Sequence, residues 1–270
     1  MIRLLDVDSR LRKLCLLKPQ EKGYTRSVLS RFTRKVGEYK LDCIIEDKVI
    51  RLLKCNGSKQ VDVVLDASFV KAWSTCHPTN SQIGYSDPEA RVGRTGRSYA
   101  LGYKVHLSID SKTMLPLSCL SASANDNEKK HSLVILERAK QVLKSSGAKL
   151  RSLIADSQYS DGKIRAAVDK AVIPYPSNQK PGDRTLLRVD KKFRTYGPEN
   201  QKKEYHKRPP IEAVNSFLKT QCSMVVNKVR GLRQVATYAL FSILCLVLNR
   251  EAAQKTGRKD KVVPPPYFNT

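Results

Sequence analysis

The chain has 270 residues, a length that suits one enzyme-sized domain with a small appendage. Its 50 lysines and arginines outnumber its 25 acidic residues, and the formal charge of +25 favours a polyanionic partner. Ribosomal and membrane-surface proteins are also basic, but a hydrophobic share of 40% and clear strand and helix patterns favour an enzyme with a buried core.

The number and spacing of the cysteines further limit the classes of protein to consider. Seven scattered cysteines form no C-x2-C pair, and only four histidines are present, which argues against a zinc site and indicates a reducing compartment. No secretory leader opens the chain, so we expect a cytoplasmic protein. The apolar stretch 235–248 is too short to cross a bilayer comfortably and is predicted to form a buried helix.

Residues 1–58 are predicted to form a basic helical region that ends at Gly57 and Ser58. Six apolar residues at roughly helical spacing support this prediction: Leu29, Phe32, Val36, Leu41, Ile44 and Ile45.

The first predicted strand runs from Val61 to Asp66 and ends at that carboxylate. A long loop over residues 71–98 follows and carries three arginines beside two glycines: Arg91, Arg94 and Arg97. Such a loop is suited to gripping a phosphate backbone, although a solvated charged loop explains it equally well. Residues 101–109 and 115–120 are predicted to form the two strands of a hairpin.

A helix is predicted from residues 125–127 to Ser146, with Asp126 interpreted as its cap and Gly147 as its stop. The fourth strand runs from Leu150 to Asp156 and again ends at a carboxylate. A short helix, a strand over 172–175 and a basic loop then lead to Tyr205.

Four residues with the spacing Y-x2-R-x3-E-x6-K follow this loop: Tyr205, Arg208, Glu212 and Lys219. Pro209 and Pro210 suit the first turn of a helix, and residues seven apart on that helix share one face. The spacing gathers one carboxylate, two cations and a phenol around one segment. Ordinary surface charges at a helix start can give the same pattern, so the quartet needs support from the rest of the chain.

The quartet resembles the YREK signature of DDE transposases, which are encoded by prokaryotic insertion sequences. The resemblance implies an α/β fold, with a ribonuclease H-like mixed five-stranded sheet flanked by helices. It also implies two aspartates and one glutamate that bind metal ions, and these correspond here to Asp66, Asp156 and Glu212. A lone aspartate at a strand end more often bonds to its own turn, but two in this order before the quartet favour catalysis.

The chemistry implied by the resemblance is DNA strand cleavage at transposon ends and strand transfer into target DNA. Asp66, Asp156 and Glu212 would hold two Mg²⁺ ions, with Mn²⁺ as a substitute. Six residues would bind DNA phosphates: Tyr205, Arg208, Lys219, Arg91, Arg94 and Arg97. The implied partners are double-stranded DNA of the ends and the target and a second copy in a synaptic homodimer, with no membrane and with localisation at the nucleoid.

The predicted domains are a basic helical region over 1–58, a catalytic domain over 59–254 and a flexible, proline-rich basic tail over 255–270. The first region is either a reduced domain that binds transposon ends or a helical brace on the core. Two further hypotheses stay open for the whole chain. It could be an inactive or domesticated DNA-binding remnant, or a ribonuclease H-like nuclease that cuts without joining.

Overall fold

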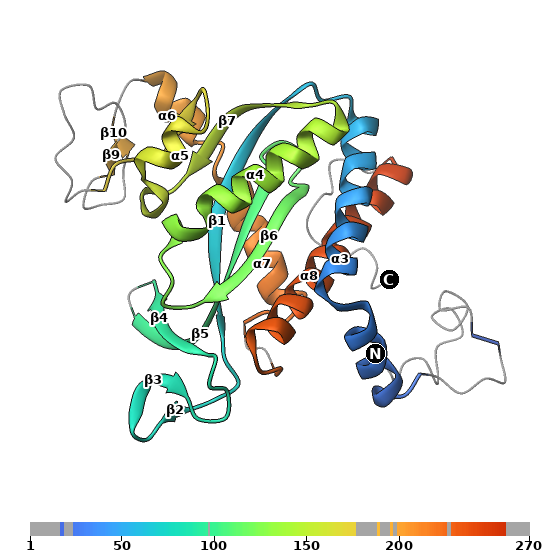
Figure 1. The fold of residues 1–270 in the computed structure, drawn as a ribbon. Helices are drawn as coiled ribbons and strands as arrows, with labels where there is room; N and C mark the ends of the chain where they lie inside the picture. Colours follow the sequence, from blue (N-terminus) through green and yellow to red (C-terminus); the bar gives the residue numbers. More distant parts are fainter. Residues whose placement is uncertain are drawn as a thin grey trace.

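The computed structural model describes residues 17–18, 24–96, 98–176, 188–189, 195–196, 199–225 and 228–257. Within these residues, a mixed sheet of eight strands is flanked by helices (Figure 1). The strand order is β2-β3-β4-β5-β1-β7-β8, and β6 pairs with β5 beside this path. The predicted class, an α/β fold with a mixed sheet flanked by helices, is confirmed, but the sheet has eight strands instead of the predicted five.

Three long antiparallel strands form the centre of the sheet: β1 (Gln60–Lys71), β5 (Ser98–Asp110) and β6 (Pro116–Ser123). The predicted hairpin is confirmed as β5 and β6. In its turn, Met114 adopts a positive φ of 55°, and the carboxylate of Asp110 accepts bonds from the backbone of Lys112 (3.0 Å) and the hydroxyl of Thr113 (2.5 Å). These local bonds define where β5 ends and β6 begins.

Two parallel strands extend the sheet on the other side of β1: β7 (Lys149–Ala155) and β8 (Ala171–Val172). The crossover to β7 is made by α4 (Glu128–Ser146), which ends at Gly147 with a φ of 80°. A parallel connection needs such a crossover, and a left-handed C-cap favours glycine. The predicted helix and its stop are confirmed.

The cap of α4 differs from the prediction. Asn127, not Asp126, is the N-cap, and its side chain accepts from the backbone of Lys129 at 3.0 Å. The carboxylate of Asp126 instead accepts from His131 at 2.9 Å and from Lys130 at 3.2 Å. Asn127 adopts the extended backbone of a cap directly before the helix, so its side chain reaches the free N–H groups first.

The segment predicted as a long loop contains three short strands: β2 (Cys76–His77), β3 (Asn80–Gly84) and β4 (Arg91–Thr95). β4 pairs with the first five residues of β5, beyond the part of β5 that pairs with β6. The loop prediction is wrong because β5 is longer than its apolar pattern indicates and leaves an edge that β4 can pair with.

The helix α3 (Arg26–Asn56) confirms that residues 24–56 are largely helical, with a kink at Gly37, where φ is 66°. Its second half is part of the hydrophobic core through Leu41, Ile45 and Val49. Most apolar side chains of its first half are exposed, including Leu29 and Phe32. The predicted division between an N-terminal region and a catalytic domain stays a prediction.

The helix α8 (Leu232–Lys255) confirms the predicted helix around residues 235–248. It is the one helix in the described ranges that is long and apolar enough to cross a membrane, and half of its apolar window is buried inside the protein. Ile243, Leu246 and Val247 belong to the same core cluster as the strands, as expected for a core helix.

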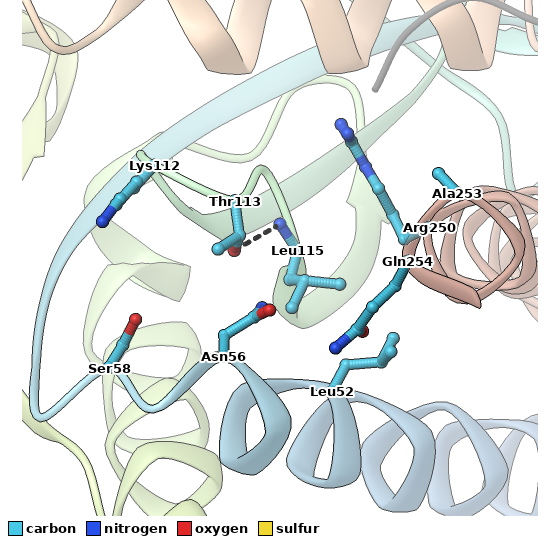
Figure 2. A pocket seen from close by; sticks show the side chains of 9 residues that line it. All are labelled: Leu52, Asn56, Ser58, Lys112, Thr113, Leu115, Arg250, Ala253 and Gln254. Atoms are coloured by element: carbon cyan, nitrogen blue, oxygen red, sulfur yellow. Dashed lines mark hydrogen bonds between the residues drawn. The ribbon is translucent and has the colours of Figure 1, made fainter. Parts of the chain in front are cut away.

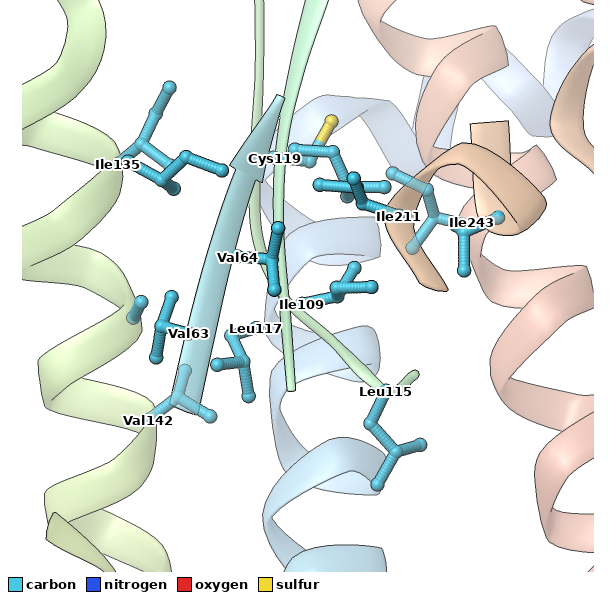
Figure 3. Close-up of a cluster of buried hydrophobic side chains, with 14 of the residues drawn as sticks. Val63, Val64, Ile109, Leu115, Leu117, Cys119, Ile135, Val142, Ile211 and Ile243 are labelled. Atoms are coloured by element: carbon cyan, nitrogen blue, oxygen red, sulfur yellow. The ribbon is translucent and has the colours of Figure 1, made fainter. Parts of the chain in front are cut away.

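Alternating side chains of β1 join the two layers of helices (Figure 3). Val63 points toward α4, where Ile135 and Val142 lie, whereas Ile211 and Ile243 lie on the opposite side of the strand. This alternation follows from the two-residue period of a strand, and it buries both faces of β1.

The chain between β7 and α8 holds the remaining elements. They are the 3-10 helix η1 (Ser157–Tyr159), α5 (Gly162–Ala166), the β9–β10 ribbon (Arg188–Val189 and Thr195–Tyr196), α6 (Glu199–Tyr205) and α7 (Pro209–Thr220). The last strand, predicted over 172–175, is confined to β8.

Candidate active site

Asp66 and Asp156 follow the last paired residues of two parallel strands. The register of β1 and β7 pairs Leu65 with Ala155; Asp66 is the next residue of β1, and Asp156 is the first residue after β7. Neighbouring strands are about 4.8 Å apart, and paired residues project from the same face of a sheet. Both aspartates have extended or strand backbone, so their side chains share one face.

The sequence pattern predicted that Asp66 ends its strand, and this prediction is wrong. β1 continues to Lys71, because the long strand β5 stays paired with it as far as Gly102. What ends after Leu65 is the parallel pairing with β7. Asp66 therefore lies where β1 loses one of its two neighbours, and this opens one side of the strand to a ligand.

The two carboxyl groups resist ionisation. Burial, and then the charge of Asp66, raise the pKa of Asp156 to about 6. Burial also raises the pKa of Asp66, although the Arg208 guanidinium acts in the opposite direction. Two acids that share one partly desolvated face repel each other, and a cation between them would relieve that repulsion.

Arg208 connects Asp66 to the glutamate of the quartet. Its guanidinium donates to Asp66 Oδ1 at 3.2 Å and to Glu212 Oε1 at 2.6 Å. Asn215, one turn after Glu212 on α7, donates to the second oxygen of Asp66 at 2.9 Å. Asp66 has 16% of its side chain exposed and Glu212 has 60%, so Glu212 stands at the rim of the site.

The predicted helix start is confirmed, because Pro209 and Pro210 form the first turn of α7, which carries Glu212. The backbone of Arg208 differs from the prediction. A residue before proline tends to avoid the helical region, yet Arg208 is helical, with φ of −72° and ψ of −36°. Its ion pairs with Asp66 and Glu212 favour this conformation over the more common extended one.

The other two members of the quartet lie on different elements. Tyr205 is the last residue of α6 and packs partly buried against the core. Burial raises its pKa, as do the charges of Asp156, Asp66 and Glu212. Lys219 lies in the last turn of α7 and makes no hydrogen bond or ion pair within the described part of the chain. Their predicted contacts with phosphate stay predictions.

An ion-pair cluster around the buried Asp62 fastens this segment to the sheet. Lys207 donates to Asp62 of β1 at 3.2 Å and to Glu204 of α6 at 2.6 Å. Asp62 also accepts from Ser152 at 2.6 Å and forms a two-point ion pair with Arg151. Burial opposes ionisation of Asp62, but these donors hold its pKa at about 2. Asp62 is therefore saturated by protein donors and has a structural role, unlike Asp66.

Tyr159 and His106 support the turn that carries Asp156. The Asp156 side chain accepts from the backbone of Gln158 at 3.0 Å and so caps the short helix η1. Tyr159, the last residue of that helix, is fully buried, and its hydroxyl lies 3.1 Å from Nδ1 of the buried His106 on β5. Asp66 and Asp156 both contribute to raising the Tyr159 pKa, after burial, so the phenol lies close to the acids.

Three residues of this site were missed in the sequence: His106, Tyr159 and Asn215. A signal existed for Asn215, which is three residues after Glu212 and therefore on the same helix face. Tyr159 follows Asp156 by three residues, but the pattern indicated only a turn there. His106 lies inside an apolar strand, and its position beside Asp66 depends on the β1–β5 register, which pairs it with Ala67.

Two arginines of the predicted phosphate-binding loop, Arg91 and Arg94, lie away from the acids. On β5, their partners are Gly102 and Tyr99, whereas the partner of Asp66 is Leu107. Gly102 and Tyr99 precede Leu107 by five and eight residues, which correspond to about 17 and 26 Å along β5. Arg91 also donates to the carbonyl of Pro88 at 2.5 Å. Arg97 lies outside the described residues, and binding of DNA by all three stays a prediction.

The acids fit a hard divalent cation. They offer carboxylate oxygens, which Mg²⁺ and Mn²⁺ prefer, and two of them are buried together with raised pKa values. In the described ranges no three acidic, histidine or cysteine side chains already form a metal-binding cluster. The guanidinium of Arg208 lies between Asp66 and Glu212 and forms an ion pair with each.

Comparisons with known proteins identify the family of the chain. Residues 57–248 match the family profile of the transposase DDE domain. A search of curated proteins finds no match. Among solved structures, the chain is similar to the piggyBac transposase in a synaptic complex with hairpin DNA, with 11% identity, a TM-score of 0.45 and coverage of 75% of this chain and 50% of that one.

A second similar structure is the Mos1 strand transfer complex, with 10% identity, a TM-score of 0.32 and coverage of 92% of this chain and 74% of that one. The chain spans half the length of the piggyBac transposase chain that it matches. The family profile covers most of the chain, including all three acids and the whole quartet. The chain therefore belongs to the transposase DDE domain family.

Proposed function

We propose that this protein is an insertion-sequence transposase that cleaves DNA at transposon ends and transfers the strands into target DNA. The observation that carries the proposal is the placement of Asp66 beside Asp156, with Glu212 joined to Asp66 through Arg208. These are the three acids that the family resemblance requires, and they come from three separate segments of the chain.

Members of the family generally use divalent metal ions. Asp66, Asp156 and Glu212 would hold two Mg²⁺ ions here, with Mn²⁺ as a substitute. When bound, such ions activate an attacking oxygen and stabilise the charge that develops on a transferred phosphate. Asp66 is the acid that connects the other two. It lies beside Asp156 at the end of the β1–β7 pairing, and it shares the guanidinium of Arg208 with Glu212.

The protein's own groups position the DNA and balance the charge. Arg208 pairs with Asp66 and Glu212, and its guanidinium would bind a phosphate next to the cut when metal ions hold these acids. Lys219, on α7, has no hydrogen-bond or ion-pair partner among the described residues and would bind a second phosphate. The Tyr205 phenol has a raised pKa, so it stays protonated and can donate a hydrogen bond.

Other parts of the chain would hold the rest of the DNA. The charge of +25 supports binding of double-stranded DNA, and cooperation between two ends would require a homodimer. The first half of α3 presents exposed basic side chains, including Arg31, Arg34 and Lys35. We therefore infer that residues 1–58 contribute to recognition of transposon ends, and that the protein acts at the nucleoid.

A strand-transfer assay tests the proposal. Duplexes carrying pre-cut transposon ends are incubated with a supercoiled target plasmid and Mn²⁺, using wild type and Asp66→Asn. A transposase joins the ends to the plasmid, and the variant does not. Plasmid nicking without joining would show a nuclease. DNA binding without either reaction would show an inactive remnant, and both of these results would overturn the proposal.

A further inference from the structure

Two aromatic side chains are exposed beyond the end of β1. Trp73 follows that strand with 48% of its surface exposed, and Tyr85 follows β3 with 63% exposed. Neither belongs to a hydrophobic cluster of the described residues. The β2–β3 hairpin between them in the sequence projects from the lower end of the sheet (Figure 1). A single exposed ring is ordinary on a protein surface, so the surroundings of the two rings decide whether they bind a partner.

A backbone hydrogen bond brings the segments of the two rings together. The N–H of Tyr85 donates to the carbonyl of Thr75 at 2.8 Å, and Trp73 precedes Thr75 by two residues. Paired segments of this kind lie about 4.8 Å apart. The Tyr85 ring also contacts the His77 imidazole, with 5.6 Å between the ring centroids. Three flat side chains therefore come from neighbouring stretches of chain.

Two cations lie beside Trp73. The Nζ atom of Lys228 is 5.9 Å from the centroid of the Trp73 ring, which is within the range of a cation–π contact. The guanidinium of Arg230 donates to the Trp73 carbonyl at 3.4 Å. Both cations belong to the segment before α8, which is joined to the end of β1 where Lys71 N–H donates to the Val225 carbonyl at 3.1 Å. This segment places positive charge next to an exposed ring.

The charge of the two segments is positive. Residues 71–96 and 224–233 contain six lysines and arginines and two acids, Asp87 and Glu89. Asp87 is buried and accepts from the N–H of Gly231 at 3.1 Å. Glu89 accepts from the N–H of Leu232 at 2.5 Å. Both acids thus bind the start of α8, and the excess of cations favours a polyanion as the partner.

Exposed rings beside cations are suited to unpaired nucleotides. Proteins bind single-stranded nucleic acid by stacking its bases on aromatic side chains and by pairing its phosphates with cations. A base has a free face only where the duplex is open, as at a cut end. Trp73 follows Asp66 by seven residues, so the ring is roughly 20 Å from the acids, a distance that about six nucleotides of one strand span.

We propose that Trp73 and Tyr85 form a stacking surface for unpaired DNA bases, with Lys228 and Arg230 binding phosphates of the same strand. The inference rests on the proposed function, in which the acids cut a DNA end. It assigns the β2–β3 hairpin and the segment before α8 to a separated strand. The groups around Asp66 would bind the phosphates at the cut itself.

Tryptophan fluorescence tests the proposal directly, because Trp73 is the only tryptophan in the chain. The probes are a dT oligonucleotide and a blunt duplex of the same length, each added to the full chain until binding saturates. A base stacked on the indole should quench its emission, whereas the duplex should leave most of the emission in place. Binding of the oligonucleotide without quenching, or equal quenching by both probes, would overturn the proposal.

Affinities of the variants for a labelled dT oligonucleotide, measured by fluorescence anisotropy, provide a second test. Trp73→Leu keeps an apolar side chain without an aromatic face and should bind roughly 5- to 100-fold more weakly. Trp73→Phe should keep most of the affinity. The control is Tyr39→Ala, which removes a ring that is 81% exposed on α3 and should bind like wild type.

An affinity of Trp73→Leu equal to that of Tyr39→Ala would overturn the proposal. If Trp73→Leu does not fold, Tyr85→Leu makes the same test at the second ring. It retains Trp73, so both the affinity and the quenching can be measured. Unchanged affinity and quenching in Tyr85→Leu would exclude this ring from the surface and overturn the proposal as stated.

A matched control for Lys228 comes from a pocket near the other end of β1 (Figure 2). This pocket, of about 250 Å³, carries the exposed Lys112, and none of the described residues that line it is aromatic. Lys228→Met should lower the slope of log affinity against log salt for the dT oligonucleotide by about 0.7, the value for one phosphate contact to a single strand. Lys112→Met should leave the slope unchanged. Equal slopes in the two variants would contradict the phosphate contact of Lys228.

Asp66→Asn separates this inference from the proposed function. The variant should quench Trp73 as wild type does, because the acids are not part of the stacking surface. If wild type fails to join DNA while the oligonucleotide still quenches Trp73, the proposed function is wrong and the stacking surface stands. Joining of DNA without quenching of Trp73 would overturn the stacking surface alone.

Discussion

Asp66 and Glu212 lie on different elements, β1 and α7, and a single guanidinium holds them together: Arg208 donates to Asp66 at 3.2 Å and to Glu212 at 2.6 Å. Arg208 thus keeps two like charges in one site. Under the proposed function, the same guanidinium would bind a phosphate next to the cut. We therefore expect Arg208 to link assembly of the site with binding of its substrate.

Replacing Arg208 with methionine should weaken both roles. Hydrogen bonds to charged groups contribute about 1.5–3 kcal/mol, so we expect DNA nicking to fall by roughly 10- to 100-fold. The measurement is the initial rate of Mn²⁺-dependent nicking. Arg208→Lys keeps one cation but loses the two-point geometry and should recover only part of the rate. A nicking rate for Arg208→Met within twofold of wild type would contradict this role.

The raised pKa of Asp156 predicts a pH-dependent stability in the absence of metal. Its folded-state pKa of about 6 lies above the ordinary value of 3.8. The contribution of this group to stability is therefore present below pH 4 and lost as the pH rises to about 6. The loss should be on the order of 3 kcal/mol, measured by chemical denaturation in EDTA.

Asp156→Asn is the matched control, since the amide cannot ionise. The difference in unfolding free energy between this variant and wild type should change across pH 4–6 and be constant above that window. Saturating Mn²⁺ should restore wild-type stability above pH 6, because the metal binds the ionised acids. Parallel pH profiles of the two proteins in EDTA would contradict the raised pKa of Asp156.

Tyr159→Phe should loosen the turn that carries Asp156. The change removes the bond to His106 and should lower the unfolding free energy by about 1–2 kcal/mol. Because such supporting residues hold metal ligands in place, Mn²⁺ affinity should fall by roughly tenfold, measured from the EPR signal of the free ion.

Tyr99→Phe is the control for Tyr159→Phe, because Tyr99 is 74% exposed and should change neither quantity. A loss of stability in Tyr159→Phe with unchanged Mn²⁺ affinity would show that Tyr159 only packs the core.

Gly102 should tolerate no side chain. A Cβ atom there would lie 2.2 Å from the carbonyl oxygen of Val70 and 2.8 Å from the Phe69 ring, in the strand pair that carries Asp66. Gly102→Ala should therefore lower the unfolding free energy by about 1–3 kcal/mol, measured by urea denaturation. Gly162→Ala has no neighbour within 4 Å and should be close to neutral. Equal stability of both variants would contradict the close approach of β5 to β1.

The sequence predicted most of the central fold because local signals agreed with it. Val61–Asp66 and Leu150–Asp156 have the apolar, branched composition of buried strands, and Gly147 adopts the left-handed C-cap that the end of α4 requires. The prolines before Glu212 gave the start of α7. These features depend on neighbours within a few residues, so a single chain reveals them.

The failures depend on contacts between distant segments. The edge of β5 pairs with β4, so a loop prediction based on glycine and arginine content was wrong. The helical backbone of Arg208 depends on ion pairs with Asp66, 142 residues earlier in the chain. His106 and Tyr159 are 53 residues apart and meet only because β5 and β7 both flank β1. Local patterns carry no information about such pairs.

The most direct test of the central claim is Mn²⁺-dependent nicking of the element's own terminal DNA by wild type and Asp156→Asn, with DNA affinity measured in parallel. We predict that the variant binds the ends within a few-fold of wild type and does not nick them, because it lacks one of the three acids that we propose hold the metal. Equal nicking by both proteins would contradict the account.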